Sequence, residues 1–410
     1  MYVNNYIQTI LFIPLFIVIF ALLIFSAKTA FYVKFKKLYQ VLILITLVGI
    51  LKGLYVGLSL NNQSNRIIQD INKLITFVFF IGLPYFIIAN RNKFLFGFFS
   101  IFNYCSIVYT LLVSMSLFIA GNVSEDNYSI YPGNLFGAST VNLTIISTWT
   151  FYALGVYYLT KKKLYIFWSF NCYLVVLGSL AKWNGFALIA FPILLGIIIY
   201  KNNPKFQRFK YLYILFSIGL LMLLLLNISV ILSPIVQARG WSNIDDFTSS
   251  RILGSTENSG TVSQSLGVGG EIGIKDGART AMWGDLLIRT SESPFLGIGL
   301  GSRALDYLGL DYEDHNIFIT HLSRYGLPLF IFWIISLFIL VNNLKLFIKS
   351  KLFINEWITK RVLIVIYLNF IFQASVGNIW GQMLVALLLG ISIGLLLIKN
   401  DTFNNCSNSV

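Results

Sequence analysis

Long runs of apolar residues, separated by short polar breaks, are the main pattern along this chain. A membrane-spanning helix needs roughly 17 to 25 mostly apolar residues, and about eleven runs approach or reach that length. They lie near residues 6–26, 38–58, 74–89, 94–119, 141–159, 164–180, 185–200, 211–232, 327–344, 362–379 and 382–398. We therefore predict an all-α polytopic membrane protein with about 11–12 transmembrane helices, the twelfth lying near 121–140 or 375–381.

The composition supports a membrane protein. Apolar residues make up 57% of the 410-residue chain and charged residues only 11%, whereas a soluble domain has about 25% charged residues. A chain of this size cannot hide so much apolar surface in its own core. Soluble enzymes, secreted domains and disordered chains are therefore excluded. The three cysteines lie far apart in the sequence and indicate neither a disulfide framework nor a thiolate metal site.

The formal net charge of +14 is concentrated in one set of alternate short loops, which holds 19 of the 30 Lys and Arg residues. The opposite short loops hold only Arg66, Lys73 and Lys182. Because basic short loops face the cytoplasm, we predict that the first set is cytoplasmic, with the amino terminus outside and the carboxyl terminus inside. The positive charge is then a topology signal, and no nucleic-acid partner is expected.

One outward loop differs from the others. It has 94 residues and contains 11 of the 16 acidic residues and both histidines. A connection this long in a compact protein is usually functional. The predicted organisation is therefore 1–232 with about eight transmembrane helices, 233–326 as a large extracytoplasmic catalytic loop, 327–398 with about three transmembrane helices, and 399–410 as a cytoplasmic tail.

Within this loop, Arg279, Trp283 and Leu286 recur at spacings of four and three, which predicts one face of a helix. We expect this helix at the membrane surface, with Trp283 at the level of the lipid headgroups. Two interpretations of Arg279 stay open. It is either a functional cation or the charged end of a side chain that extends to the surface from a packing helix.

Three glycines at alternate positions, Gly297, Gly299 and Gly301, follow Pro294. Their spacing is similar to a dinucleotide-binding fingerprint, but that motif needs a preceding strand and a compartment that contains the dinucleotide. We predict instead that these glycines let the backbone turn tightly and approach a ligand or another helix closely.

The two histidines are six residues apart, so on a helix they point to different faces and cannot jointly hold a metal ion. We predict that Asp314 caps this helix and that Gly326 ends it before the next span. His315, beside two acidic residues at the helix start, is a candidate general base. His321 is expected to be structural.

In this order the motifs resemble those of the O-antigen ligase and Wzy-type polysaccharide polymerase superfamily, over roughly residues 275–330. The family pattern is an arginine and a tryptophan on a short helix, a proline followed by closely spaced glycines, and His-Asn opening the helix before a late span. Arg279 and Trp283 match the first element, and His315 and Asn316 match the last.

Two positions depart from the family pattern. Leu329 stands where ligase-like members usually have Gly, Thr or Tyr. Lys182 stands in a short outward turn where the family tends to carry an arginine, and lysine lacks the planar fork that binds phosphate bidentately.

The resemblance implies a GT-C-like glycosyltransferase of the bacterial inner (plasma) membrane, with its active site on the outer face. It implies an undecaprenyl-pyrophosphate-linked oligosaccharide as donor, an inverting reaction without metal or cofactor, and the lipid bilayer, a chain-length regulator and a flippase as partners. His315 would act as the base and Arg279 would stabilise the leaving pyrophosphate. The expected substrate contacts are Lys182, Asn316, Arg289 and Arg303.

The sequence is compatible with three functions. We favour a polymerase that joins repeat units on the lipid carrier, with a ligase that moves the glycan onto lipid A-core as the alternative. A lipid-linked oligosaccharide flippase is less favoured. A transporter is expected to place ionisable residues in its spans, whereas the spans predicted here are nearly free of charge, with Lys52 as the exception.

Overall fold

The computed structural model describes residues 30–60, 63–89, 97–116, 139–179, 185–202, 277–304, 316–349, 356–376, 385 and 387–397. These residues are almost entirely helical, and no strand runs through them. Four helical segments are long and apolar enough to cross a membrane, namely Lys37–Ser59, Ser64–Pro84, Phe98–Met115 and Ile317–Ile339. The described part of the chain is thus a helical protein whose apolar helices are compatible with a polytopic membrane fold.

The helices fall into two compact units. The first unit contains α2 (Ala30–Ser59), α3 (Ser64–Ala89), α14 (Gly277–Glu292) and α15 (Ile317–Lys349). The second contains α5 (Phe98–Ser116), α6 (Ser139–Thr160), α7 (Lys163–Ser179), α8 (Gly185–Asn202) and most of α16 (Glu356–Val376). Each unit combines segments from distant parts of the sequence.

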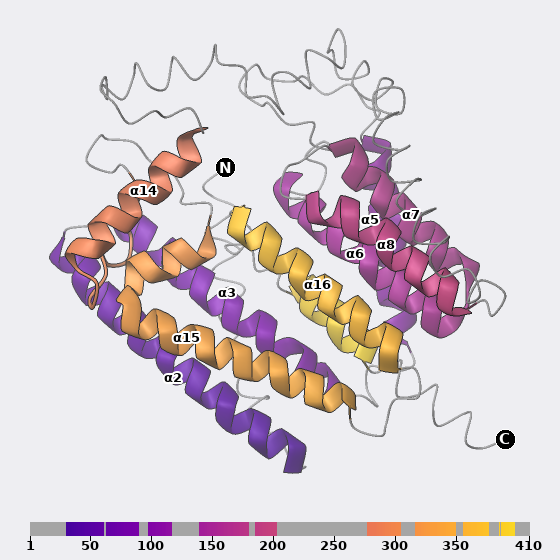
Figure 1. The fold of residues 1–410 in the computed structure, drawn as a ribbon, viewed down its shortest axis with the longest axis horizontal. Coiled ribbons are helices and arrows are strands. Elements are labelled where there is room, and N and C mark those ends of the chain that lie inside the picture. The colour runs from indigo at the N-terminus through magenta and orange to yellow at the C-terminus, as the bar shows by residue number, and fades with distance from the viewer. Residues whose placement is uncertain are drawn as a thin grey trace, which may run out of the picture. The chain divides into compact units, whose positions relative to one another are not determined.

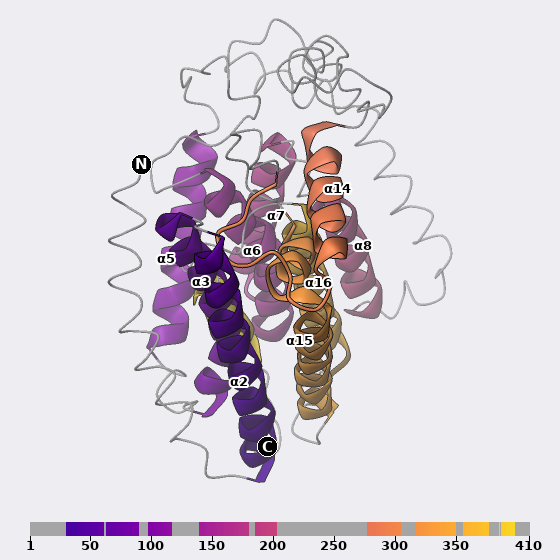
Figure 2. The same cartoon turned by 90° about the vertical axis from the view of Figure 1, so that its left-hand side faces the viewer.

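In the first unit, α2 packs along both α3 and α15, and α14 packs at the amino-terminal end of α15 (Figure 1, Figure 2). Only four residues separate α2 from α3, so these two helices are antiparallel neighbours. The hydroxyl of Tyr39 on α2 donates to the carbonyl of Val78 on α3 at 2.9 Å. This bond satisfies a polar group that would otherwise be costly inside an apolar bundle.

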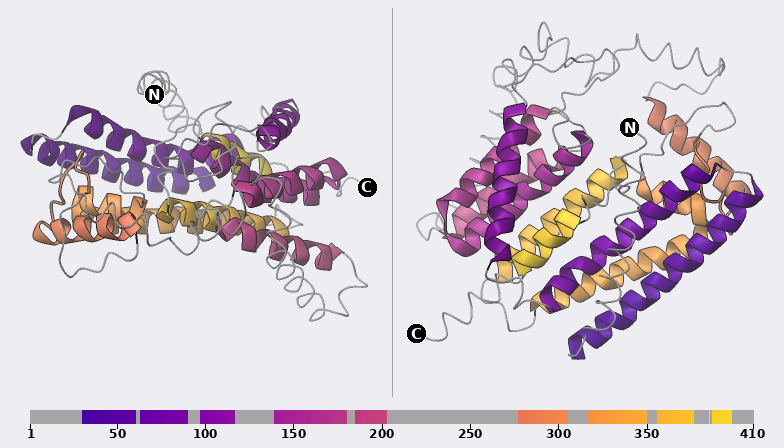
Figure 3. Two further views of the ribbon diagram at one scale, coloured as in Figure 1. Left: turned by 90° about the horizontal axis from the view of Figure 1, so that it is seen from above. Right: turned by 180° about the vertical axis from the view of Figure 1, so that it is seen from behind.

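In the second unit, α6 lies at the centre of a bundle with α7 and α8, and α5 packs on α7 (Figure 3, right panel, purple to magenta). Every residue from 143 to 156 is buried, which suits a helix that carries no polar stripe. Hydroxyls and amides link the helices. The Trp168 indole donates to Thr110 at 3.0 Å, and the Tyr152 hydroxyl donates to Asn103 at 2.9 Å.

The start of α3 differs from the sequence-based expectation. Arg66 and Lys73 were expected in a short loop before a span at 74–89, but the helix already begins at Ser64. The early turns are helical because Ile67, Asp70 and Leu74 lie on one buried face, at spacings of three and four residues. A charged residue, Asp70, is therefore buried inside a helix that is apolar enough to span a membrane.

Candidate functional site

An irregular segment of residues 293–304, here called the glycine segment, connects the helices at one end of the first unit. Its backbone is bonded to both α2 and α15. The Leu300 amide donates to the Gly53 carbonyl at 2.8 Å, and the Ile298 amide donates to the Ser323 carbonyl at 2.7 Å. These bonds attach the loop to two helices rather than leaving it on the surface.

The alternating glycines are required by this packing. Gly297, Gly299 and Gly301 all have positive φ, at 71°, 79° and 82°, a region that side chains with a Cβ rarely adopt. A Cβ on Gly299 would lie 2.6 Å from the backbone nitrogen of Gly57 on α2. The prediction that these glycines allow a tight turn and a close approach to another helix is confirmed.

The surface that receives the glycine segment is also made of glycine. Gly49, Gly53 and Gly57 recur every four residues on α2, where they face Tyr325 and Leu300. A Cβ on Gly57 would overlap the carbonyl oxygen of Leu300. Small residues at this spacing let two backbones approach closely inside a membrane. The spacing of these three glycines is itself a sequence signal for such a close approach.

Replacing Gly299 by alanine should destabilise the protein by about 2 to 4 kcal/mol, because the new Cβ meets both an unfavourable φ and the backbone of α2. Gly284 is the matched control, since it lies within α14 and a Cβ there has no atom within 4 Å. Gly284→Ala should raise helix stability by up to about 1 kcal/mol. Thermal unfolding of the two purified variants in detergent measures the difference, and equal melting temperatures would contradict the assignment.

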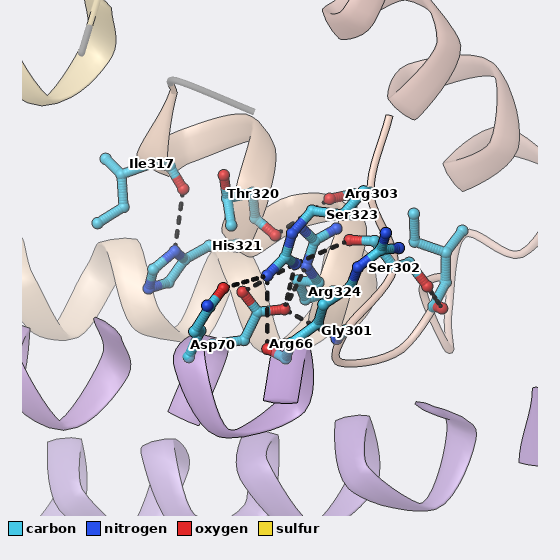
Figure 4. Close-up of polar contacts among 12 residues, drawn as sticks. Arg66, Asp70, Gly301, Ser302, Arg303, Ile317, Thr320, His321, Ser323 and Arg324 are labelled. Carbon is cyan, nitrogen blue, oxygen red and sulfur yellow. Dashed lines mark hydrogen bonds and ion pairs between the residues drawn. The ribbon is translucent and has the colours of Figure 1, made fainter. Parts of the chain in front are cut away.

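A buried ionic cluster joins the glycine segment to α3 and α15 (Figure 4). The Asp70 carboxylate accepts hydrogen bonds from the Gly301 amide at 2.8 Å, from the Arg303 guanidinium at 3.0 Å and from Nε of Arg324 at 2.9 Å. Asp70 is 2% exposed and both arginines are 1% exposed. One carboxylate between two guanidinium groups leaves a net positive charge, and its multiple hydrogen bonds offset the cost of burial.

An apolar cluster brings the three motif elements together. Leu286 of α14 and Ile298 and Ala304 of the glycine segment are buried against one another. Trp283 of α14 and Ile319 of α15 pack on the same cluster. The face of α14 predicted from the spacing of Trp283 and Leu286 is therefore a packing face. It fixes α14 beside the start of α15.

The amino terminus of α15 is capped by Asn316 rather than by Asp314, so the predicted cap was wrong. The side-chain oxygen of Asn316 accepts from the Phe318 and Ile319 amides at 3.0 and 3.2 Å. Asparagine satisfies the orphan amides of a first turn well, and the helix accordingly begins at Ile317. His315 then directly precedes the cap in the sequence.

Gly326 interrupts α15, as predicted, with φ 74° and ψ 168°. The break frees carbonyl groups that other elements then satisfy. The Lys52 ammonium on α2 donates to the carbonyls of Tyr325, at 2.7 Å, and Phe295. The Leu327 amide donates to the carbonyl of Pro294 at 2.7 Å. A kink whose polar groups are all bonded within the protein can persist in an apolar environment.

The structure places the three arginines of the predicted site at separate positions. Arg279 lies on α14 near its amino end. Arg289, on the same helix, is 27% exposed, lies 3.6 Å from Asp285 and donates to the Arg303 carbonyl at 2.9 Å. Arg303 itself is bound to Asp70 and buried, which is the position of a structural cation. Lys182 and His315 lie outside the described residues.

His321 has the structural position expected for it. It is 2% exposed, its Nδ1 lies 2.9 Å from the Ile317 carbonyl, and its ring lies 4.2 Å from that of Trp333. Leu329, the departure from the ligase-like pattern, packs on a buried cluster that includes Leu300 and Tyr325. Both positions therefore contribute to packing at the kinked start of α15.

Comparisons of this chain with protein-family models, curated proteins and solved structures found no match. The function proposed for the site therefore rests on the chemistry of its own residues. Within the ranges that the structure describes, no group of three or more His, Cys, Asp or Glu side chains is placed to hold a metal ion. The described side chains bring together cations, a carboxylate and backbone amides.

Sequence reasoning missed the part played by Asp70, Arg324 and Lys52. Each is a charged residue in or beside an apolar run, and such residues rarely occur there without a partner or a function. The candidate spans carry more charge than predicted, because Asp70 and Arg324 both lie in helical segments long enough to span a membrane. No spacing rule predicted that they pair, since 254 residues separate them.

Proposed function

We propose that this protein is a membrane glycosyltransferase of the Wzy polymerase type. It would transfer an undecaprenyl-pyrophosphate-linked glycan onto the next lipid-linked repeat unit. The observation that carries the proposal is the convergence of three separate motif elements on one apolar cluster. The helix of Arg279, the glycine segment and the capped start of α15 meet there, although the sequence separates them by up to about 40 residues.

The chemistry follows from the groups on these elements. A bond forms between the acceptor hydroxyl oxygen and the anomeric carbon while the bond from that carbon to the pyrophosphate oxygen breaks. His315 would take the hydroxyl proton, and the leaving pyrophosphate would depart with its negative charge. A fixed cation at that point stabilises the transition state, and we assign this role to Arg279. Attack opposite the leaving group inverts the anomeric configuration.

Asn316 and Arg289 complete the proposed site. The cap formed by Asn316 sets where α15 begins, and His315 is the residue before it in the sequence. Arg289 remains a candidate contact for phosphate or sugar, because its side chain is partly exposed. Arg303 is left out of the proposed substrate contacts, since its guanidinium is buried against Asp70. The proposal also includes 11–12 membrane spans, an inner-membrane location and a site that faces outward.

A ligase that transfers the glycan to lipid A-core is the alternative. It would use the same groups, so the acceptor is what distinguishes the two. The departure of Leu329 from the ligase-like pattern favours the polymerase, and Leu329 packs against Leu300 and Tyr325. A flippase is less favoured. Asp70 and Arg324 are ionisable residues in candidate spans, as a transporter would require, but they are bonded to each other inside a buried cluster.

Deletion of the gene, followed by a gel of the cell's lipopolysaccharide, tests the proposal. Core carrying a single repeat unit would support the polymerase. Bare core with long glycan accumulating on the lipid carrier would instead indicate the ligase. An unchanged ladder would exclude O-antigen as the product. Transfer of sugar by purified protein in proteoliposomes, without lipid translocation, would separate both enzymes from a flippase.

Arg279→Lys should lower polymerisation by about 100-fold, because lysine keeps the charge but loses the fork that binds a pyrophosphate bidentately. Lys182→Arg should be tolerated, since it restores the family's usual residue. The measurement is the rate of glycan extension in membranes that contain equal amounts of each variant. Equal tolerance at the two positions would remove the argument for Arg279.

A further inference from the structure

An apolar groove with a volume of about 640 Å³ lies between α8 and α16 of the second unit. Ile193 of α8 and Ile364 of α16 are each 46% exposed, so the groove opens on the outer surface of the bundle. Its volume falls within the range of small-molecule and lipid sites, roughly 300 to 1,000 Å³. The residues that line it include Phe186, Ile193, Ile197, Ile364, Val365 and Arg361.

Among the described residues that line the groove, Arg361, near the beginning of α16, is the charged one. At the other end of the groove, the ring of Phe186 at the start of α8 lies 6.2 Å from that of Phe372 at the end of α16. The two walls therefore run antiparallel, so the last turn of α8, which contains Lys201, lies at the Arg361 end. A ligand that matches this pattern has a long apolar chain and an anionic head.

The rest of the bundle adds positive charge at the same end. Ser147 of α6 bonds Asn369 of α16 at 3.2 Å, and a Cβ on Gly155 would lie 3.1 Å from Val362. Helix α6 thus runs antiparallel to α16, and the exposed lysines 161–163 that follow α6 lie at the Arg361 end. No acidic residue occurs in α6, α7 or α8, and the one acidic residue of α16 is Glu356, its first residue.

We propose that this groove binds one acyl chain of an anionic glycerophospholipid, with the phosphate at Arg361 and the lysines after α6. Basic pockets between helices on the cytoplasmic side of a membrane favour anionic headgroups. These lysines and Arg361 belong to the set of basic residues predicted to face the cytoplasm. The site is therefore distinct from the proposed glycan-transfer site, and the proposal does not depend on that activity.

The test uses the full-length protein in phosphatidylcholine vesicles that carry a trace of photoactivatable lipid. One probe is phosphatidylglycerol with a diazirine in its acyl chain, and the other is phosphatidylcholine with the same chain. Labelled peptides are mapped by mass spectrometry. We expect the phosphatidylglycerol probe to label residues 186–198 and 361–365 about fivefold more than the phosphatidylcholine probe, for one basic contact to a headgroup.

Two pairs of variants make the result specific. Arg361→Gln should reduce the preference for phosphatidylglycerol, whereas Lys37→Gln removes an equal charge from α2 and should leave it unchanged. Ile193→Trp should fill the groove and reduce labelling there. Leu174→Trp, at an exposed position of α7 outside the groove lining, should not. The arginine pair remains informative even if tryptophan impairs folding.

Three results would overturn the proposal. Equal labelling of the groove by both probes would mean that it holds bulk lipid without regard to charge. Unchanged labelling in Arg361→Gln would remove the headgroup assignment. Competition by undecaprenyl phosphate, but not by phosphatidylglycerol, would make the occupant the polyprenyl chain of a substrate instead of a glycerophospholipid.

Discussion

His315→Ala should abolish polymer formation while the protein still inserts and folds. A general base contributes about 10² to 10⁴ in rate, so even the lower value would remove visible polymer from a gel. The reason is specific to this position. His315 directly precedes the cap of α15 in the sequence, and the start of α15 packs on the same cluster as the helix that carries Arg279. The measurement is glycan extension in membranes, normalised to the amount of folded protein.

The other histidine provides the control for His315→Ala. His321 is buried against Trp333 and bonded to the Ile317 carbonyl, so His321→Phe should lower stability while leaving the activity of each folded molecule nearly unchanged. Near-normal polymer from His315→Ala would refute the base assignment. If both variants folded but neither made polymer, the loss in His315→Ala would not count as evidence for a base.

Asp70→Asn should destabilise the protein by about 3 to 5 kcal/mol, which is the typical effect of removing one partner from a buried ion pair. The variant would take the Asp70 carboxylate away from buried Arg303 and Arg324, and the Gly301 amide would lose a charged acceptor. The glycine segment should then separate from α3. Thermal unfolding in detergent, followed by the elution profile of the folded fraction, measures this effect.

Two variants show whether charge is the cause. Asp70→Glu keeps the carboxylate and should retain more stability than Asp70→Asn. Asp285→Asn removes a carboxylate from the more exposed pair with Arg289, and such a pair contributes only about 0.3 to 0.5 kcal/mol. If Asp70→Asn melted at the same temperature as Asp285→Asn, the buried cluster would have no structural role.

Periodicity and local rules predicted much of the helical framework. The helix around Trp283 and the interruption at Gly326 are confirmed, because each depends on spacing or on backbone conformation within a few residues. The glycines after Pro294 were predictable for the same reason. The start of α3 was missed, because charged residues such as Arg66 and Asp70 are typical of loops. Only their tertiary partners make a helix favourable there.

The candidate site was only partly predictable. Arg279, Trp283 and Asn316 were identified from a motif, and the structure places them on elements that meet in one cluster. Arg303 was expected among the substrate contacts, as a cation for the leaving pyrophosphate. Its guanidinium is instead bound to Asp70, which lies more than 200 residues earlier in the chain. A motif shows which groups are present, but it cannot show which of them are already neutralised.

The amino-acid sequence by itself determined that this chain is apolar and helical, that a helix runs through Trp283 and that Gly326 interrupts α15. Those properties depend on side-chain volume, hydropathy and backbone freedom within a few residues of each position. Only the tertiary structure decided that Lys52 bonds the carbonyls at the kink and that Asp70 pairs with Arg303 and Arg324. Such pairs form because a buried charge requires a partner, and its identity depends on which distant helices the fold brings together.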